Sequence, residues 1–402
     1  MNPPARPAQP GAGWRDLASE IQALERAGLR RSLREAAGLP LAECTLDGRP
    51  MVNFGSNNYL GLATHPEVIA AAQEAAGAEG TGTGASRLLS GNQSGYRRLE
   101  ATLADWKGTE SALVFSSGFA AAVGAIPALA GPGDAVACDR LAHASLLDGA
   151  RLSRARLLVY PHADPAALDR VLARQRRRFR RVLVVTDGLF SMDGDICPLP
   201  ELIAVAERHD ARLLVDDAHA TGVLGGGGGG TLEHFGVAGV DRVVQMGTLS
   251  KALGSAGGFI AGPDVLREWL VNRARTLVFS TGVPASSLAA AGAAVGLARR
   301  QAWRRTRLRE LSVRVRGAAR AAGLVVPEGD TPVIPVMLGD EHRAMRWMDA
   351  MLARGLFVPG VRPPTVPAGG SRLRISLMAT HTDEHAGRLV ETLAAFAGRE
   401  PS

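Results

Sequence analysis

The sequence contains almost no lysine. Only Lys107 and Lys251 occur among 402 residues, although lysine and arginine together number 46. An arginine guanidinium stays protonated at any ordinary pH, whereas a lysine amine can lose its proton and act as a nucleophile. Any chemistry that requires a lysine therefore has two candidates. The general bias toward arginine, alanine and glycine explains the scarcity, but it does not explain where the two lysines remain.

Cysteines and long apolar runs are also scarce. The three cysteines (Cys44, Cys138 and Cys197) have no metal-site spacing and form no disulfide framework, so we expect a reduced, cytoplasmic setting and no metal centre. The longest weakly charged stretch, 116–133, is interrupted by two prolines and is not expected to span a membrane. Residues 1–13 lack the apolar core of a signal peptide, which predicts a frayed tail.

The charge is moderately positive. Basic residues outnumber the 39 acidic ones, for a net charge of +7, and the densest basic run is 174–181. This run directly precedes the apolar residues 182–185, which are typical of a buried parallel strand. We interpret it as a solvated helix end. Because no zinc finger, helix-turn-helix signature or aromatic stacking platform accompanies it, we expect no nucleic-acid binding.

Short apolar runs alternate with helical patterns from residue 48 to about residue 282. This alternation predicts an α/β domain with a mostly parallel central sheet and helices on its faces. The expected strands are 112–115, 135–137, 157–160, 182–185, 212–215 and 242–245, and the expected helices include 142–153, 165–176 and 199–209. Polar sequences follow several of these strands at their carboxyl ends, where open α/β sheets bind their ligands.

The rest of the chain divides around this domain. We expect a tail and helical arm over 1–47, with a helix from about residue 17 to 37, then a large domain over 48–285 and a small C-terminal α+β domain over 286–402. The small domain is predicted to contain one long helix at 286–322, strands at 333–337 and 372–377, and a helix at 342–354. Six consecutive glycines at 225–230 predict a mobile loop.

Lys251 is the stronger candidate for lysine chemistry. It follows an expected strand and lies among glycine, threonine and serine residues, where a bulky ligand can approach. An exposed lysine, with a pKa near 10.4, is mostly protonated, so a reactive lysine is usually enclosed. Lys107, next to Trp106 and Gly108, is interpreted as an ordinary surface residue of a helix.

An acidic pair precedes Lys251 by about 35 residues. The strand at 212–215 ends in Asp216-Asp217-Ala218-His219. A carboxylate in this position can pair with a protonated ring nitrogen, as in pyridoxal phosphate enzymes. His219 could reach the phenolic oxygen of such a ring or simply cap the turn.

Two further segments are consistent with a cofactor site. Ser117, Gly118 and Phe119 form a strand-to-helix turn, whose free N–H groups could bind a phosphate, although such turns are common. His143 begins another helix, where its ring could stack on a planar cofactor or serve as the N-cap.

These motifs together resemble the α-oxoamine synthases, a family of fold-type-I pyridoxal phosphate transferases. The resemblance rests on 247–254 around Lys251, on Asp216 and His219, and on His143, and it covers the chain from about residue 29 onward. Within the family, four segments are most similar to the branch that acts in biotin biosynthesis. They are 53–62, 117–120, 190–195 and, most specifically, 361–369.

The resemblance implies a reaction and its partners. L-Alanine would condense with a pimeloyl thioester of coenzyme A or acyl carrier protein, with loss of carbon dioxide and the thiol. The alternative is a glycine-using relative, glycine C-acetyltransferase, also called 2-amino-3-ketobutyrate CoA ligase. The family further implies a homodimer with shared active sites. Some relatives are non-catalytic subunits, but this chain retains Lys251.

The resemblance also implies residue roles. Lys251 would bind the cofactor covalently and move the substrate Cα proton, while Asp216 would keep the pyridine nitrogen protonated. His143 would stack on the ring. The remaining positions are Ser191 and His219 at the phenolic oxygen, Ser117, Gly118, Phe119 and Thr248 at the phosphate, Ser280 and Thr281 from the partner subunit, Arg362 at the substrate carboxylate, and Asn57 and Arg30 for substrate positioning.

Three positions depart from the family pattern. Ala122 stands near a position where relatives often have asparagine, the six glycines replace a Gly-x-x-Gly-Arg-Gly segment, and Asp187 stands where the biotin branch often has glutamate. These departures bear on the substrate more than on the cofactor.

Overall fold

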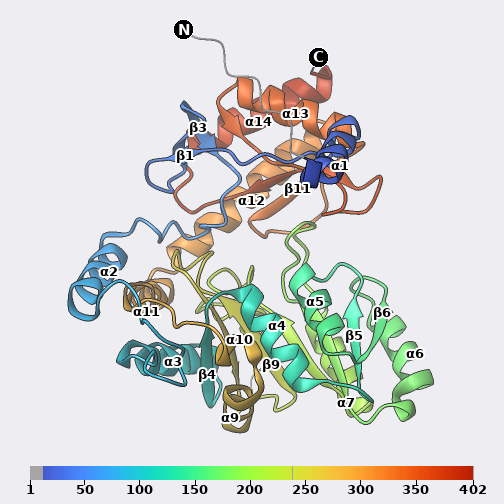
Figure 1. Ribbon diagram of the computed structural model, residues 1–402. Coiled ribbons are helices and arrows are strands. Elements are labelled where there is room, and N and C mark those ends of the chain that lie inside the picture. The colour runs from blue at the N-terminus through green and yellow to red at the C-terminus, as the bar shows by residue number, and fades with distance from the viewer. Residues whose placement is uncertain (1–11, 238, 402) are drawn as a thin grey trace.

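The chain forms a large α/β body and a smaller α+β body, which lie one above the other in Figure 1. The computed structural model describes residues 12–237 and 239–401, so most of the tail expected at 1–13 lies outside the described residues. No helix in the described part of the chain is both long and apolar enough to cross a membrane.

A seven-stranded sheet forms the centre of the large body. Its spatial order is β4-β10-β9-β8-β7-β5-β6. The five strands from β9 to β6 are parallel, whereas β10 runs antiparallel to both of its neighbours. The strands are β4 (Ser111–Phe115), β5 (Ala135–Asp139), β6 (Arg156–Tyr160), β7 (Val182–Asp187), β8 (Arg212–Asp216), β9 (Val243–Thr248) and β10 (Gly258–Gly262). The prediction of a mostly parallel sheet is confirmed.

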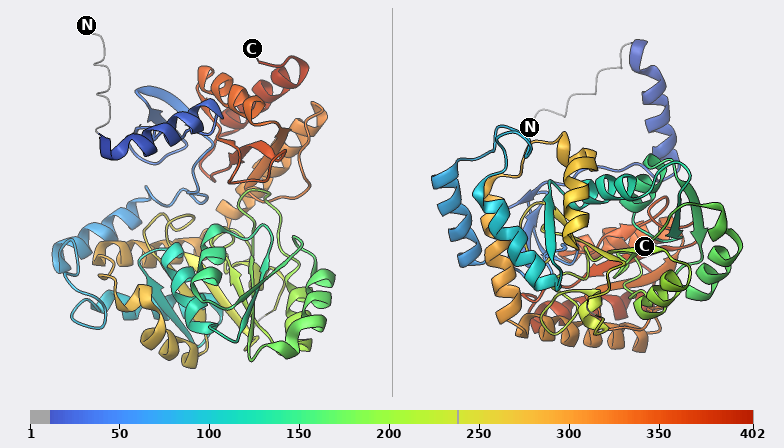
Figure 2. Two further views of the ribbon diagram at one scale, coloured as in Figure 1. Left: turned by 45° about the vertical axis from the view of Figure 1, so that its right-hand side comes forward. Right: turned by 90° about the horizontal axis from the view of Figure 1, so that it is seen from below.

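Both faces of this sheet are buried, because successive strand residues point to opposite sides. In β5, Val136 and Cys138 pack against the helices of one face, and Ala135 and Ala137 pack against those of the other. Figure 2 shows the helical layers from two further directions. The first face is covered by α4 (Gly118–Leu129), α5 (Ala144–Leu152), α9 (Asp264–Arg273) and α10 (Arg275–Val278), and the second by α6 (Pro165–Gln175), α7 (Leu199–Arg208) and α3 (Ser94–Lys107).

The smaller body contains two sheets, and residues from both ends of the chain contribute to it. Antiparallel strands β11 (Val333–Gly339), β14 (Ser371–Ser376) and β13 (Gly360–Val361) form one sheet. The other consists of β1 (Ala36–Ala37), β2 (Glu43–Leu46), β3 (Arg49–Asn53) and β12 (Leu356–Phe357). The helices packed on these sheets are α12 (Trp303–Ala321), α13 (Glu341–Ala353) and α14 (Asp383–Gly398).

The other helices of the described residues are α1 (Arg15–Arg26), α2 (Pro66–Glu79), α8 (Thr231–His234), α11 (Ala285–Arg300), η1 (Ala12–Trp14) and η2 (Arg176–Arg178).

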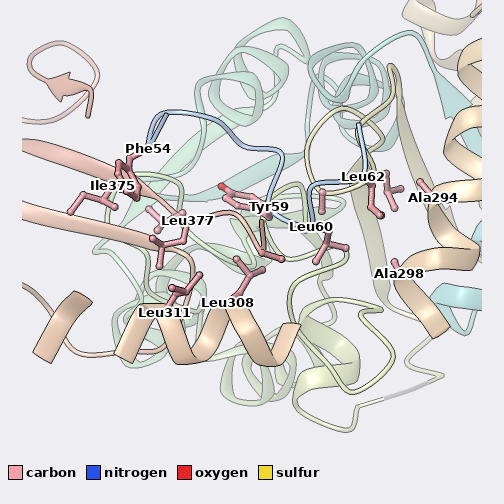
Figure 3. Packing of buried hydrophobic residues seen from close by; sticks show 14 of the residues in the cluster. Phe54, Tyr59, Leu60, Leu62, Ala294, Ala298, Leu308, Leu311, Ile375 and Leu377 are labelled. Carbon is pink, nitrogen blue, oxygen red and sulfur yellow. The ribbon is translucent and has the colours of Figure 1, made fainter. Parts of the chain in front are cut away.

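The segment after β3 crosses from the smaller body to the larger one through a shared apolar core. Phe54, Tyr59, Leu60 and Leu62 are fully buried there. Figure 3 shows them beside residues of α11, α12 and β14. This crossing brings residues near position 57 toward the carboxyl edge of the large sheet.

Two helix predictions are wrong. The helix expected at 17–37 ends at Arg26, because Gly28 adopts a φ of 65° and the N–H groups of Gly28 and Leu29 bond to Glu25 and Leu24. Such a left-handed glycine with paired carbonyls is the Schellman helix stop.

The helix expected at 286–322 is two helices, α11 and α12. Gln301, at the end of α11, has a φ of −106° and a ψ of 61°, which leaves the helical region. No glycine or proline stands at this break, so the helical pattern continues across it in the sequence.

Candidate active site

Three parallel strands bring acidic and basic groups together at one edge of the large sheet. Asp187 ends β7 and is paired in register with Asp216 at the end of β8. Asp216 is in turn opposite Met246 of β9, and Lys251 follows β9 closely in sequence. Because the carboxyl ends of parallel strands meet at one edge, residues 64 positions apart, Asp187 and Lys251, form one site.

The Lys251 amine is enclosed. Burial lowers its pKa to about 8, while the nearby Asp216 and Asp187 carboxylates act in the opposite direction and Arg374 reinforces the decrease. A substantial fraction of this amine is therefore neutral at mildly alkaline pH, as a nucleophilic lysine requires.

The two carboxylates beside Lys251 do not have the same surroundings. Burial raises the pKa of Asp216, whereas the charges of Lys251 and His143 lower it. Burial and the Asp216 charge together raise the pKa of Asp187 well above its usual value. The Asp187 carboxylate accepts a hydrogen bond from the His143 N–H at 3.0 Å, and Asp216 accepts one from the Ala218 N–H at 2.9 Å. The site thus favours one negative charge over two.

His143 is the N-cap of α5. Its Nδ1 atom accepts from the Ser145 N–H at 3.3 Å and lies 2.8 Å from Ser145 Oγ. The residue is nevertheless exposed in the single chain. Desolvation lowers its pKa, with Asp216 opposing and Lys251 reinforcing this change. Capping through Nδ1 fixes the ring while leaving surface that a planar ligand could cover.

His219 belongs to a buried network that includes two residues not identified from the sequence. Its Nδ1 atom lies 2.6 Å from Tyr59 Oη, and Tyr59 donates to Asn57 Oδ1 at 3.2 Å. Arg374 of β14 donates to Asn57 Oδ1 at 3.3 Å. Burial lowers the pKa of His219 well below its usual value, so the imidazole is neutral. Arginines at alternate positions of an expected strand, 372 and 374, are the sequence signal that could have indicated Arg374.

The turn at Ser117 packs so closely against Gly258 that no side chain fits at that glycine. Ser117 Oγ accepts from the Ala120 N–H at 3.0 Å and caps α4. A Cβ at Gly258 would lie 2.5 Å from the Gly118 nitrogen, and a Cβ at Gly118 would lie 3.4 Å from Thr248 Cβ. The Thr248 hydroxyl donates to the Gly257 carbonyl at 2.9 Å. Helix α4 therefore begins beside a hydroxyl, with unpaired N–H groups suited to a phosphate. Phe119, the next residue, is half exposed.

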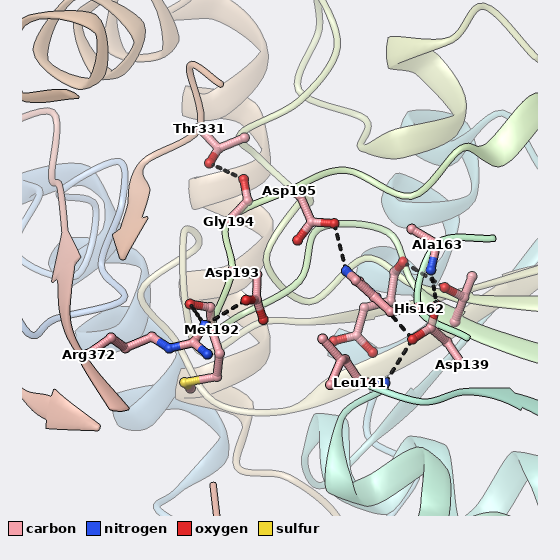
Figure 4. Close-up of polar contacts among 12 residues, drawn as sticks. Asp139, Leu141, His162, Ala163, Met192, Asp193, Gly194, Asp195, Thr331 and Arg372 are labelled. Carbon is pink, nitrogen blue, oxygen red and sulfur yellow. Dashed lines mark hydrogen bonds and ion pairs between the residues drawn. The ribbon is translucent and has the colours of Figure 1, made fainter. Parts of the chain in front are cut away.

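The loop that contains Ser191 is fixed to both bodies. Arg374 donates to the Ser191 carbonyl at 2.5 Å, Arg372 pairs with Asp193 at 2.6 Å, and Thr331 donates to the Gly194 carbonyl at 2.6 Å. On the other side, His162 bridges Asp139 and Asp195 at 3.1 and 3.0 Å, as Figure 4 shows.

His162 makes a pH-dependent contribution to stability. Partial burial disfavours its charge, but hydrogen bonds to Asp139 and Asp195 outweigh this effect and raise its pKa from 6.5 to about 10. A raised folded-state pKa stabilises the fold fully below the unfolded value, and this stabilisation is lost as pH rises through the folded value. We expect His162→Gln to lower the free energy of unfolding most near pH 6.5 and least near pH 10 in urea titrations.

The matched control is His234→Gln, at an exposed position of α8. Its difference from wild type is expected to stay constant over the same range. A His162→Gln difference that is also constant with pH would show that the imidazolium is not the stabilising species.

Two of the predicted substrate residues lie together, and the third lies in the network around His219. Arg362 donates to the Arg30 carbonyl at 2.7 Å, and Arg31 donates to the Thr365 hydroxyl at 2.9 Å. The arm after α1 thus lies along the proline-rich segment 361–369. Asn57 instead contacts Tyr59 and Arg374.

Ser280 and Thr281 lie outside the hydrogen-bonded groups described above. Thr281 is exposed and its backbone forms an isolated β-bridge with Ser86. Within the described part of this single chain, neither residue makes a hydrogen bond with Lys251, Asp216 or His143.

The prediction that Lys107 is a surface residue is wrong. Its side chain is completely buried at the end of α3 and forms an ion pair with Asp217 at 2.8 Å. Trp-Lys-Gly at a helix end gave no indication of burial, because α3 presents Lys107 to a loop more than a hundred residues away.

The six glycines are not a loose loop either. Trp106 and Lys107 donate to the carbonyls of Gly227 and Gly229 at 3.0 and 2.6 Å, and Glu233 accepts from both of these glycine N–H groups at 2.5 Å. The close contacts of this loop, rather than a need for mobility, explain why residues 225–230 are glycine. Elsewhere in the described residues, no three His, Cys, Asp or Glu side chains gather in a way that could hold a metal ion.

The fold and the strand-edge lysine define a fold-type-I pyridoxal phosphate transferase. The family model for aminotransferase class I and II matches residues 49–393. The chain is 49% identical over 388 residues to the 8-amino-7-oxononanoate synthase of Geobacter sulfurreducens, covering 96% of this chain and 98% of that protein. It therefore belongs to the 8-amino-7-oxononanoate synthase family, which confirms the resemblance seen in the sequence.

Solved structures agree with this assignment at the level of the fold and the cofactor class. Serine palmitoyltransferase from Sphingomonas wittichii superimposes with a TM-score of 0.90 at 35% identity over 98% of both chains. A structure of SPT with a PLP internal aldimine gives a TM-score of 0.89 at 34% identity over 96% of this chain and 98% of that one.

Proposed function

We propose that this protein catalyses the decarboxylative condensation of L-alanine with a pimeloyl thioester in biotin biosynthesis. The products are 8-amino-7-oxononanoate, carbon dioxide and the free thiol of coenzyme A or acyl carrier protein. The observation that carries the proposal is the enclosed Lys251 beside Asp216, in a chain about half identical to synthases of this name.

The site fits pyridoxal phosphate, a planar pyridine with an aldehyde, a phenolic oxygen and a phosphate. When bound, this group withdraws electrons from the amino-acid Cα and so makes its proton acidic. Lys251 would hold it covalently, Asp216 would face its ring nitrogen and His143 would cover its face. The remaining contacts would come from Ser117, Gly118, Phe119 and Thr248 at the phosphate and from Ser191 and His219 at the phenolic oxygen.

Each of these residues has a separate role in the proposed reaction. Lys251, once free, removes the alanine Cα proton, and its pKa of about 8 suits it to act as a base near neutral pH. Cα attacks the thioester carbonyl, the C–S bond breaks and the thiolate leaves. The carboxylate then departs as carbon dioxide, and a proton returns to Cα to give the product. Arg362 would bind the substrate carboxylate through two parallel N–H donors, a geometry that lysine cannot provide. Arg30 and Asn57 would help to position the substrates.

We further propose a cytoplasmic homodimer in which Ser280 and Thr281 complete the partner's site. Apolar side chains near these residues support this: Leu89 is 80% exposed and Phe279 is 70% exposed. The Ser86–Thr281 bridge joins the two segments that contain them. Large exposed apolar groups of this kind mark interaction surfaces. The net positive charge would help to attract coenzyme A phosphates or an acidic carrier protein.

The substrate assignment is tested by thiol release. We expect the purified protein with pyridoxal phosphate to release free thiol from pimeloyl-CoA with L-alanine faster than with serine or glycine. Equal or faster release from acetyl-CoA with glycine would instead identify a glycine C-acetyltransferase. Preference for serine would point to the chemistry of the palmitoyltransferases that share the fold.

A further inference from the structure

The buried Lys107 forms a second charged cluster immediately behind the proposed cofactor site. Its Nζ atom contacts Asp217 Oδ2 at 2.8 Å, the Gly229 carbonyl at 2.6 Å and the Thr221 hydroxyl at 3.4 Å. Neither side chain of the Lys107–Asp217 pair is exposed to solvent. Burying two charges is costly, so such a pair is favourable only when hydrogen bonds satisfy it fully.

Asp217 is satisfied in its charged form. Besides Lys107, its carboxylate accepts from the Thr231 hydroxyl at 2.5 Å and from the Thr231 N–H at 3.1 Å. Its own N–H donates to the Met246 carbonyl at 2.7 Å, which continues the β8–β9 pairing. Adjacent residues of an extended chain point to opposite sides, and here Asp216 points toward Lys251 while Asp217 points toward Lys107.

The packing around the cluster leaves no room for side chains. A Cβ at Gly188 would lie 2.3 Å from Asp217 Oδ1, and a Cβ at Gly230 would lie 2.1 Å from Asp217 Oδ2 and 2.8 Å from Lys107 Nζ. Gly230 also has a φ of 103°, which other residues rarely adopt. The Gly188 N–H donates to the Asp216 carbonyl at 2.8 Å. The cluster therefore touches the backbone of both strand ends that present Asp187 and Asp216.

We propose that Lys107 is a positioning residue of the cofactor site. By neutralising Asp217 and holding the six-glycine loop against it, Lys107 leaves Asp216 as the only carboxylate of this acidic pair whose charge acts on the cofactor ring. The proposal rests on the proposed function only in taking pyridoxal phosphate as the cofactor.

The electrostatic consequence has a definite sign. Asp216 faces Lys251, His143 and Asp187, and the charge of the adjacent Asp217 makes a small contribution that raises its pKa. The Lys107 cation, in contact with Asp217, opposes that contribution. Removing Lys107 leaves the Asp217 charge uncompensated, so the pKa values of the ionisable groups in the site rise. Removing Asp217 instead leaves Lys107 as a buried unpaired cation, which lowers these pKa values.

The test is a charge cycle on the holoenzyme. Lys107→Met is expected to move the pH at which the bound cofactor changes colour upward by about one unit. Asp217→Asn is expected to move it downward, and the double variant Lys107→Met/Asp217→Asn to return it to within about 0.3 units of wild type. Both single variants should also weaken pyridoxal phosphate binding by about tenfold or more, measured by titration of the apo-protein.

Arg309→Met is the matched control, since Arg309 forms an exposed ion pair with Asp330 and its loss changes the net charge equally. It should leave both the transition and the cofactor affinity unchanged. Lys107 and Asp217 variants that lose stability but keep the wild-type transition would overturn the proposal and leave a merely structural pair. If Lys107→Met does not fold, the Asp217→Asn and double variants still decide between these outcomes. A wild-type protein that binds no pyridoxal phosphate would refute the proposed function itself.

Discussion

Replacing Lys251 with alanine is expected to remove the yellow colour of the bound cofactor and to lower turnover by more than about 10⁴-fold. The reason is that, among the residues that the structure describes, Lys251 is the only amine enclosed beside Asp216 and Asp187. We propose that both the covalent bond to the cofactor and the transfer of the Cα proton depend on it. The measurements are the absorbance spectrum of the reconstituted protein and thiol release from pimeloyl-CoA.

Lys251→Arg is the informative control for this experiment. It retains a positive charge near Asp216 but provides no amine that loses its proton at ordinary pH. Equal loss of colour and turnover in both variants would identify the amine, rather than the charge, as the essential feature. Lys107 cannot serve as the control, because its removal leaves Asp217 buried without its cation. Retention of the colour in Lys251→Ala would contradict the assignment of the site.

Asp216→Asn is expected to lower turnover by about 10²–10³-fold while the protein still folds. Asparagine has the same shape but cannot provide the negative charge that keeps a ring nitrogen protonated. The variant also makes a prediction about pH. Because the Asp216 charge raises the pKa of Lys251, its removal should lower that pKa below about 8.

The measurement is a pH titration of reactivity at Lys251 in the apo-protein, together with steady-state turnover. Asp210→Asn is the control, since Asp210 precedes the amino end of the same strand and is exposed. We expect it to leave both quantities unchanged. A Lys251 pKa that stays at about 8 in Asp216→Asn would show that the two groups do not interact as the structure implies.

Much of the large body could be predicted because its strands are buried on both faces. Continuous apolar runs such as 182–185 identify such strands directly, and β7 lies where that run is. The antiparallel strand β10 has the sequence Gly-Phe-Ile-Ala-Gly, whose flanking glycines resemble a turn, so it was not predicted. The break at Gln301 and the early end of α1 were missed because they depend on backbone conformation at one residue.

The proposed site was only partly predictable. Lys251 and Asp216 follow strands and belong to recognisable motifs, so their neighbourhood could be inferred. The contacts of Tyr59 and Arg374 could not be inferred, since Tyr59 is 160 positions from its partner His219, and Arg374 is 317 positions from Asn57. Only the crossing of segment 54–62 between the two bodies brings these groups into contact.

The two lysines illustrate what the sequence determined and what depended on the tertiary structure. The sequence alone determined that any lysine chemistry belongs to Lys107 or Lys251, and the small residues and the strand before Lys251 favoured that residue. The tertiary structure decided the surroundings of both amines. Burial and neighbouring carboxylates set the pKa of Lys251, and the meeting of α3, the end of β8 and the six-glycine loop encloses Lys107. Burial and charge pairing depend on contacts between distant segments, so no local pattern could distinguish the buried Lys107 from a surface residue.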